Sequence, residues 1–119
     1  MEKTFFYKGK TYRVFTVYTK FENVDVICVP TTYSVGDSLA IQMLEVENGM
    51  VQDCFTVLTV NLGNPFLQTD TRAFVDTNNN PWAVTFIRNN RLGKKTGDIQ
   101  PSGYCTYPLY EFNLKRFTV

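Results

Sequence analysis

An Asn-Gly pair, Asn48-Gly49, stands between two runs of apolar and β-branched residues, and no other feature of the chain constrains its fold as strongly. Asn and Gly tolerate the positive φ angles of a type I′ turn, the two-residue turn that best joins paired strands. Residues 38–47 and 50–62 are therefore expected to form an antiparallel hairpin. In the first arm the apolar positions change from odd to even numbers near residue 43, which predicts a β-bulge there.

Three further strands are predicted in the first thirty residues. Gly9 separates two runs rich in aromatic and β-branched residues, so strands are expected at 3–8 and 10–19. The strand at 10–19 has apolar side chains on both faces, which is typical of a central strand. A short apolar run at 24–29 is expected to end at Pro30, because proline lacks the N–H group that a sheet requires.

One helix is predicted around the only tryptophan of the chain. Asn79 or Asn80 would cap its first turn, and Pro81 suits the first helical position because its φ angle is already helical. Gly93 follows where a left-handed residue commonly ends a helix. Apolar residues four positions apart place one stripe of the helix against the sheet. These pairs are Trp82 with Phe86 and Ala83 with Ile87.

The fold class that follows is α+β. Residues 93–103 are expected to form a loop and residues 104–114 a final strand. Aromatic residues make up 15% of the chain, and they favour half-buried sheet surfaces. We therefore expect one antiparallel, twisted β-sheet of about five or six strands with one α-helix packed on it. Residues 1–119 are expected to be a single domain, because the length suits one core and no linker or repeat interrupts it.

The predicted location is the cytoplasm, and no catalytic site is predicted. No apolar run is long enough for a signal peptide or a membrane-spanning helix. The three cysteines are widely spaced and form no CxxC pair, as is typical of reduced thiols. The chain contains no histidine, the commonest general base near neutral pH and the commonest metal ligand. Neither a metal nor a cofactor is therefore predicted, and the protein is not expected to be an enzyme.

Three other patterns are weaker indications of chemistry. The sequence GKKT at 93–96 resembles the end of a phosphate-binding loop, but Arg88 stands where that motif requires its first glycine. Cys105 would need a basic neighbour to act as a nucleophile, and a small buried side chain in a strand is the alternative interpretation. No spacing specifies a paired-carboxylate site among Asp76, Asp98 and Glu111.

A cluster of positive charge is the candidate contact surface. Between residues 77 and 97 four basic side chains have no acidic counterpart. These four, named the basic segment below, are Arg88, Arg91, Lys94 and Lys95. Such charge attracts both phosphate backbones and acidic protein surfaces. Tyr104 and Tyr107 follow, and exposed tyrosines anchor protein interfaces or stack on single-stranded bases. The alternative is an ordinary helix end and a solvated loop, with tyrosines that pack in the core.

Three segments of the second half carry a resemblance to a known family. They are LTVNL at 58–62, AFVDTNNNPWAVTFIRNNRLGKKTG at 73–97 and SGYCTYPLYEFNL at 102–114, in which VDTNNNPW and GYCTYPLYEF are the strongest elements. They resemble small domains of unknown function encoded on phages, plasmids and conjugative elements of bacteria. The resemblance implies an accessory gene of a mobile element, and small proteins from that setting often bind and neutralise host-defence proteins.

The function predicted from these observations is that of a non-enzymatic, protein-binding accessory protein of a phage or mobile element. It would inhibit a bacterial defence effector, as anti-CRISPR and anti-restriction proteins do. The partner would be a host or bacterial protein such as a defence nuclease, bound by the basic segment with Tyr104 and Tyr107, and no membrane contact is expected. The alternative is a nucleic-acid-binding domain that uses residues 88–97. Salt distinguishes the two, because binding to phosphates weakens steeply as salt rises.

Overall fold

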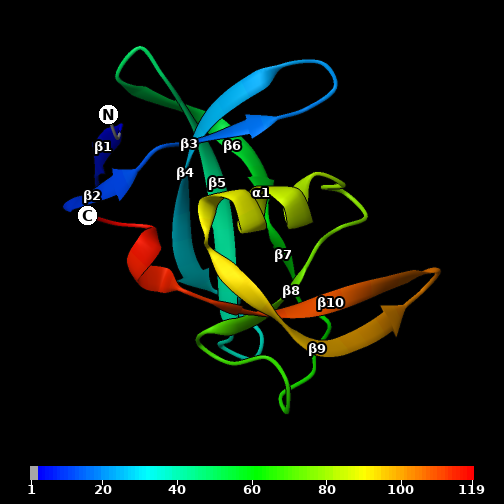
Figure 1. Ribbon diagram of the computed structural model, residues 1–119. Coiled ribbons are helices and arrows are strands. Elements are labelled where there is room, and N and C mark those ends of the chain that lie inside the picture. Colours follow the sequence, from blue (N-terminus) through cyan, green and yellow to red (C-terminus); the bar gives the residue numbers. More distant parts are fainter. Residues whose placement is uncertain (1–2) are drawn as a thin grey trace.

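The structure, a computed structural model that describes residues 3–119, contains two four-stranded antiparallel sheets, a two-stranded hairpin and two short helices (Figure 1). The first sheet, in the order β3-β4-β5-β6, contains Phe15–Tyr18, Asn23–Thr32, Leu39–Glu47 and Met50–Val57. The second, in the order β7-β8-β10-β9, contains Thr59–Val60, Arg72–Val75, Cys105–Phe112 and Gly93–Ser102. The hairpin consists of β1, Thr4–Tyr7, and β2, Lys10–Arg13. The helices are α1, Ala83–Asn90, and the 3₁₀ helix η1, Leu114–Arg116.

This mostly antiparallel architecture with one α-helix in the described residues agrees with the α+β class, but the prediction of one sheet is wrong. β6 and β7 follow each other almost directly and belong to different sheets, because the chain changes direction at Leu58. The N–H of Leu58 donates to Ile41 O at 2.9 Å, and its carbonyl accepts from Asp76 N at 2.9 Å. Leu58 therefore joins the two sheets, a role that a local strand pattern does not reveal.

Both predicted hairpin turns are confirmed. Asn48 and Gly49 join β5 to β6 with φ angles of 54° and 75°, and Lys8 and Gly9 join β1 to β2 with 46° and 84°. The predicted bulge is also present, because the β5–β6 register shifts directly after Met43. These features depend on a few adjacent residues, which explains why the sequence predicts them.

The strand expected at 10–19 divides at Val14 into β2 and β3. β3 pairs only with β4, so it is an edge strand of the first sheet and not a central one. The apolar side chains on the two faces of residues 10–19 pack in two different cores. Tyr12 packs in a small core beneath the β1–β2 hairpin, whereas Phe15 and Val17 pack in the main core.

Pro30 does not end its strand, contrary to expectation. It pairs with Ile41 of β5, and Ile41 directs its own N–H and C=O to Thr59 and Leu58, away from β4. Pro30 therefore occupies a non-hydrogen-bonded pair, in which its nitrogen points away from β5. β3 covers that side of β4 only as far as Val26, so the missing N–H deprives no strand of a partner.

Residues 93–102, expected as a loop, form β9. In the pairing with β10, a bulge places Thr96–Asp98 opposite Leu109. Thr96 Oγ1 donates to Leu109 O at 3.1 Å, and Gly97 has a φ angle of 96°. β9 is an edge strand, where glycine, proline, lysine and bulges are tolerated because they discourage pairing with other chains. Composition alone therefore gave the wrong assignment.

The ends of α1 also differ from the prediction. Its N-cap is Trp82, without a side-chain cap, because the Asn80 side chain turns toward β6 and its Nδ2 donates to Val57 O at 3.0 Å. The left-handed residue at the other end is Arg91, with a φ angle of 57°, and Gly93 lies in β9. No helix within residues 3–119 combines the length and the apolar character needed to cross a membrane.

Three hydrophobic clusters stabilise these elements. The main core is shared by both sheets and α1, and the predicted apolar stripe of the helix lies in it, with Phe86 in edge-to-face contact with the Trp82 ring at 5.7 Å. The outer face of the first sheet has a smaller core around Ile27, covered by the β1–β2 hairpin. The outer face of the second sheet has another around Phe74 and Leu109.

Candidate functional site

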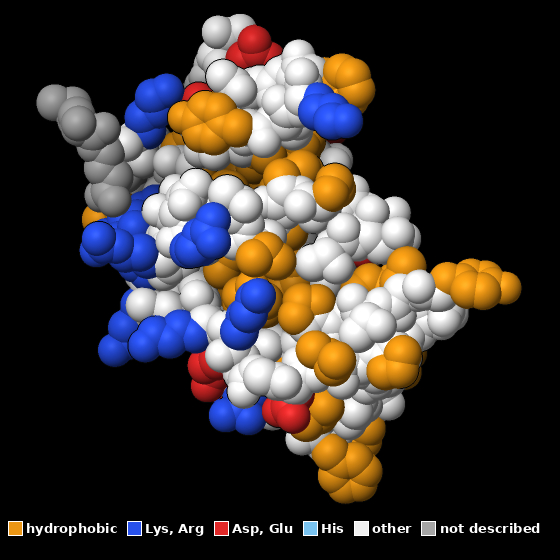
Figure 2. Space-filling view, turned by 45° about the vertical axis from the view of Figure 1, so that its right-hand side comes forward, with side chains coloured by type: hydrophobic (Ala, Val, Ile, Leu, Met, Phe, Trp, Pro, Cys, Tyr) orange, Lys and Arg blue, Asp and Glu red, His pale blue; other side chains and the backbone are white. Residues whose placement is uncertain are grey.

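Two hollows flank α1, because the helix directs different side chains to its two sides. Thr85 and Asn89 line the hollow beside β3, whereas Val84 and Arg88 line the hollow beside β9 and β10. In the view of Figure 2, lysine and arginine side chains gather on the left of the molecule, while exposed hydrophobic side chains lie toward the lower right. The two hollows differ in chemistry, since one is lined by basic residues and the other by uncharged ones.

The larger hollow, named the basic groove, has a volume of about 910 Å³. All four residues of the basic segment line it, two from the end of α1 and two from the start of β9. Its other lining residues are Thr71, Val84, Gly93, Tyr110, Glu111, Phe112 and Asn113. The fold thus brings the predicted cations together in one groove.

The connection from α1 to β9 determines the position of these cations. The left-handed conformation of Arg91 ends the helix, and the N–H of buried Leu92 donates to Ile87 O at 3.0 Å. Gly93 then lies so close to β10 that a Cβ atom on it would be 2.8 Å from Glu111 O. The two lysines that follow therefore begin β9 at a fixed position beside the helix end.

The basic groove carries an excess of positive charge. Among the described residues, its one lining carboxylate is Glu111, whose Oε1 is 3.7 Å from Arg72 Nε. Among residues 3–119, no member of the basic segment forms a salt bridge, and all four are exposed. An anionic group that enters the groove would meet four cations without carboxylate partners.

Part of the groove wall is apolar. Val84 comes from α1, and Tyr110 and Phe112 come from β10 with their ring centroids 6.1 Å apart. Burial raises the pKa of Tyr110, and the nearby positive charge of Arg88 offsets part of this increase. The Tyr110 hydroxyl therefore stays neutral at physiological pH, and the groove combines a cationic rim with a neutral wall.

The two tyrosines predicted beside the basic segment do not join it. Tyr107 is 9% exposed and packs with Phe74 and Leu109 in the outer core of the second sheet, so it is not available to a partner. Tyr104 is fully exposed at the tip of the β9–β10 hairpin. The part of β9 that separates it from Lys95, residues 95–102, is about 23 Å long. Tyr107 and Tyr110 are three residues apart on β10, so the alternation of side chains places them on opposite faces, and Tyr110 reaches the groove instead.

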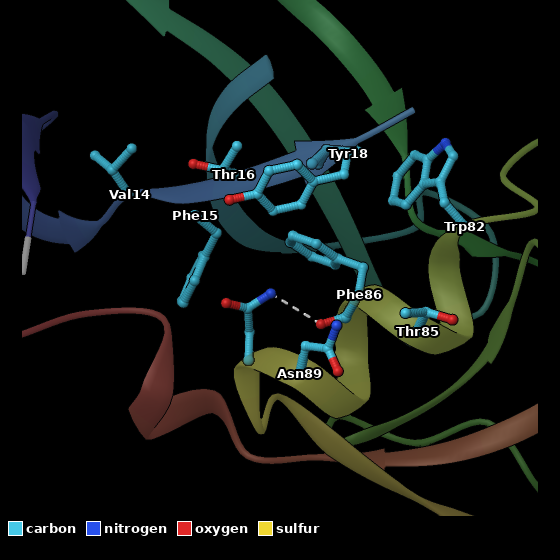
Figure 3. A pocket seen from close by; sticks show the side chains of 10 residues that line it. Val14, Phe15, Thr16, Tyr18, Trp82, Thr85, Phe86 and Asn89 are labelled. Carbon is cyan, nitrogen blue, oxygen red and sulfur yellow. Dashed lines mark hydrogen bonds between the residues drawn. The ribbon is translucent and has the colours of Figure 1, made fainter. Parts of the chain in front are cut away.

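The smaller hollow, named the β3–α1 cleft, has a volume of about 300 Å³ (Figure 3). Aromatic and amide side chains dominate it, and none of the described residues that line it is charged. The lining residues are Val14, Phe15, Thr16, Val17, Tyr18, Trp82, Thr85, Phe86, Asn89 and Asn90. This cleft was not predicted from the sequence. A signal was present, because Thr85 and Asn89 are polar residues four positions apart beside the apolar stripe.

Cys28, Cys105 and Asp76 take part in packing or turn formation. Cys28 is buried, and its burial raises the pKa of the thiol to about 12. Cys105 is half-buried beside Tyr107, in agreement with its alternative interpretation as a packing residue. Asp76 accepts hydrogen bonds from the backbone and the side chain of Asn79 at 3.1 and 2.8 Å, which is turn chemistry. Residues 3–119 contain no group of three or more cysteines and carboxylates placed to hold a metal ion.

Fold and site together define a class of protein, a mostly antiparallel α+β protein with a basic groove beside its helix. The chain belongs to the family described as a domain of unknown function (DUF4313), whose model matches residues 29–118. No curated protein and no solved structure shows significant similarity to it. The matched range contains every residue that lines the basic groove, whereas β3 precedes it.

Proposed function

We propose that this protein acts by binding and not by catalysis, and that the basic groove contacts an acidic surface of a partner protein. The observation that carries the proposal is the convergence of four exposed cations, without carboxylate partners, on a groove with an apolar wall. Charge of this kind steers an acidic partner, and arginine beside apolar surface is typical of strong contacts in interfaces.

The proposed setting is the one that the family resemblance implies, the accessory genes of phages and other mobile elements. There the partner would be a bacterial defence effector such as a CRISPR or restriction nuclease, and the protein would inhibit it by occluding an acidic surface. The groove offers a preformed contact, because Gly93 and Leu92 fix the α1–β9 connection. A preformed surface loses little conformational entropy on binding.

One observation favours an acidic protein over a nucleic acid as the partner. Among the described residues, no aromatic ring beside the groove is exposed, since Tyr110 and Phe112 of its wall are buried and Tyr104 is distant, so bases would find no exposed ring to stack on. The contact is therefore expected to involve Arg88, Arg91, Lys94 and Lys95 together with the apolar wall.

A charge-reversal variant tests the proposal. Arg91→Glu, Lys94→Glu and Lys95→Glu in one chain should abolish capture of the partner from a bacterial lysate treated with nuclease. The control carries the same change of charge at Lys8, Lys10 and Lys20, which are exposed and lie outside the groove. It should retain the partner, identified by mass spectrometry, and both variants should unfold at nearly the wild-type temperature.

The other outcomes are equally informative. Retention of the same protein by the groove variant would show that the surface is wrong. Loss of all captured material on nuclease treatment, with affinity that falls steeply as salt rises, would favour the nucleic-acid alternative. The inhibitory step is tested by adding the purified protein to the captured effector and measuring its activity. Unchanged activity would contradict inhibition while leaving the binding proposal intact.

A further inference from the structure

Aromatic side chains enter the β3–α1 cleft from both elements that form it (Figure 3). Tyr18 extends from β3 and is 70% exposed, and Trp82 stands half-buried at the start of α1. Phe15 and Phe86 are buried at its base, in edge-to-face contact with centroids 6.1 Å apart. The volume of about 300 Å³ is at the lower limit for small-molecule sites, which suits a ligand of one or two fused rings.

Several polar groups of the cleft have no partner in the described chain. Within residues 3–119, the Thr85 hydroxyl, the Asn89 amide and the Tyr18 hydroxyl form no hydrogen bond. By contrast, Thr16 Oγ1 donates to Asp25 at 2.7 Å, and Asn90 Nδ2 donates to a helix carbonyl at 2.9 Å. The cleft therefore presents aromatic surface beside hydrogen-bonding groups that are available to a ligand.

We propose that the β3–α1 cleft binds a neutral, planar heteroaromatic ring, the base of a nucleoside. An aromatic face stacks on any base, and the Asn89 amide offers a donor and an acceptor side by side, which match the edge of a base. The described residues that line the cleft include no lysine, arginine or carboxylate, so a phosphate gains nothing there. The ligand is thus a nucleoside and not a nucleic acid backbone, and the site is independent of the basic groove.

The single tryptophan of the chain supplies a direct measurement, because Trp82 lines the cleft. Titration of the full chain with adenosine, guanosine, cytidine and uridine should produce a saturable change in Trp82 fluorescence with at least one of them. Asn89→Leu should weaken that nucleoside about tenfold, the effect of one or two lost hydrogen bonds. Tyr18→Ala should weaken it at least about fivefold through lost stacking.

Matched variants outside the cleft serve as controls. Asn78→Leu and Tyr104→Ala alter exposed residues of the same types and should bind as the wild type does. The charge-reversal variant of the basic groove should also bind normally, which separates this proposal from the proposed function. Thermal unfolding confirms that each variant is folded.

Three results would overturn the proposal. The first is the absence of a saturable change with all four nucleosides. The second is wild-type affinity in both Asn89→Leu and Tyr18→Ala. The third is a nucleoside monophosphate that binds more than about tenfold tighter than its nucleoside and loses this gain in the charge-reversal variant, because the ligand would then lie in the basic groove.

Discussion

At Gly93 the backbone of β9 lies against that of β10. A Cβ atom there would lie 2.8 Å from Glu111 O and 3.3 Å from Phe112 Cα, and neither backbone atom can rotate away. Gly93→Ala is therefore expected to lower the free energy of unfolding by about 3 kcal/mol in urea denaturation. Gly36→Ala is the control, since its φ of 90° costs roughly 1 kcal/mol but no atom lies within 4 Å. Equal losses would contradict the steric cause.

Gly93 also shows what a local sequence pattern does not reveal. From the sequence, Gly93 is expected to be the left-handed residue that ends α1, but Arg91 takes that conformation. Glycine is required at position 93 for a different reason, the close approach of β10. The need arises from β10, whose position depends on a pairing that no local pattern specifies. The same holds for the site. The basic segment is predicted because its members are neighbours in the chain, whereas Tyr110 and Glu111 enter the groove only through that pairing.

The buried thiol of Cys28 makes the free energy of unfolding depend on pH in the alkaline range. Burial raises the pKa of this group from its ordinary 9.0 to about 12, so the unfolded chain loses the proton first as pH rises. The free energy of unfolding is therefore unaffected by this group below about pH 9. Between pH 9 and about pH 12 it falls as pH rises, by as much as about 4 kcal/mol in total. In urea denaturation at increasing pH, the free energy of unfolding of Cys28→Ala should fall less steeply than that of the wild type. Cys54→Ala, which alters an exposed thiol, should show the same pH dependence as the wild type. Equally steep declines would contradict the assignment.

Among the elements, the loop between β7 and β8 is ordered by one buried amide. Gln68 is 6% exposed, and its Oε1 accepts from Leu62 N at 3.1 Å and from Asn64 N at 3.0 Å. Its Nε2 donates to Ser38 Oγ at 3.1 Å and to Asn61 Oδ1 at 3.0 Å. All the hydrogen-bonding capacity of this side chain is thus used to hold the loop.

Replacement of this amide tests its role in the loop. Gln68→Met preserves the approximate volume but leaves two partly buried N–H groups, those of Leu62 and Asn64, without an acceptor, so the free energy of unfolding should fall by about 2–4 kcal/mol in urea denaturation. Gln52→Met is the matched control, because Gln52 is exposed and makes one hydrogen bond, to Glu47 O at 3.1 Å. A loss of less than about 1 kcal/mol at Gln68 would show that the loop is held by other contacts.

The predictable elements are those whose cause is local. Two-residue turns, a change of apolar phase and a helical stripe each lie within a few residues, and the turns at Gly9 and Asn48-Gly49 are confirmed. β9 was missed because its glycines, lysines and proline indicate a loop, while a long pairing with β10 and a bulge at Gly97 make it a strand. The energy of that pairing comes from residues far away in the sequence, and it outweighs local propensity.

For the molecule as a whole, the main core decides how the two sheets behave together. Val26 of β4 and Val75 of β8 are both fully buried in it, although they belong to different sheets. Phe86 and Ile87 of α1 pack in the same cluster. Alternating apolar residues show which face of a strand is buried, but not against which sheet. The alternation of apolar residues therefore does not determine the number of sheets.

A shared core predicts that the two sheets unfold together. Val26→Ala in the first sheet and Val75→Ala in the second should each lower the free energy of unfolding by about 2 kcal/mol, because each leaves a cavity in the same cluster. In both variants Trp82 fluorescence and far-ultraviolet circular dichroism should give one coincident transition in urea, with an unchanged slope. If Val75→Ala moved the circular dichroism transition away from that of Trp82, the second sheet would unfold independently. The core would then be two adjoining cores, each stabilising its own sheet.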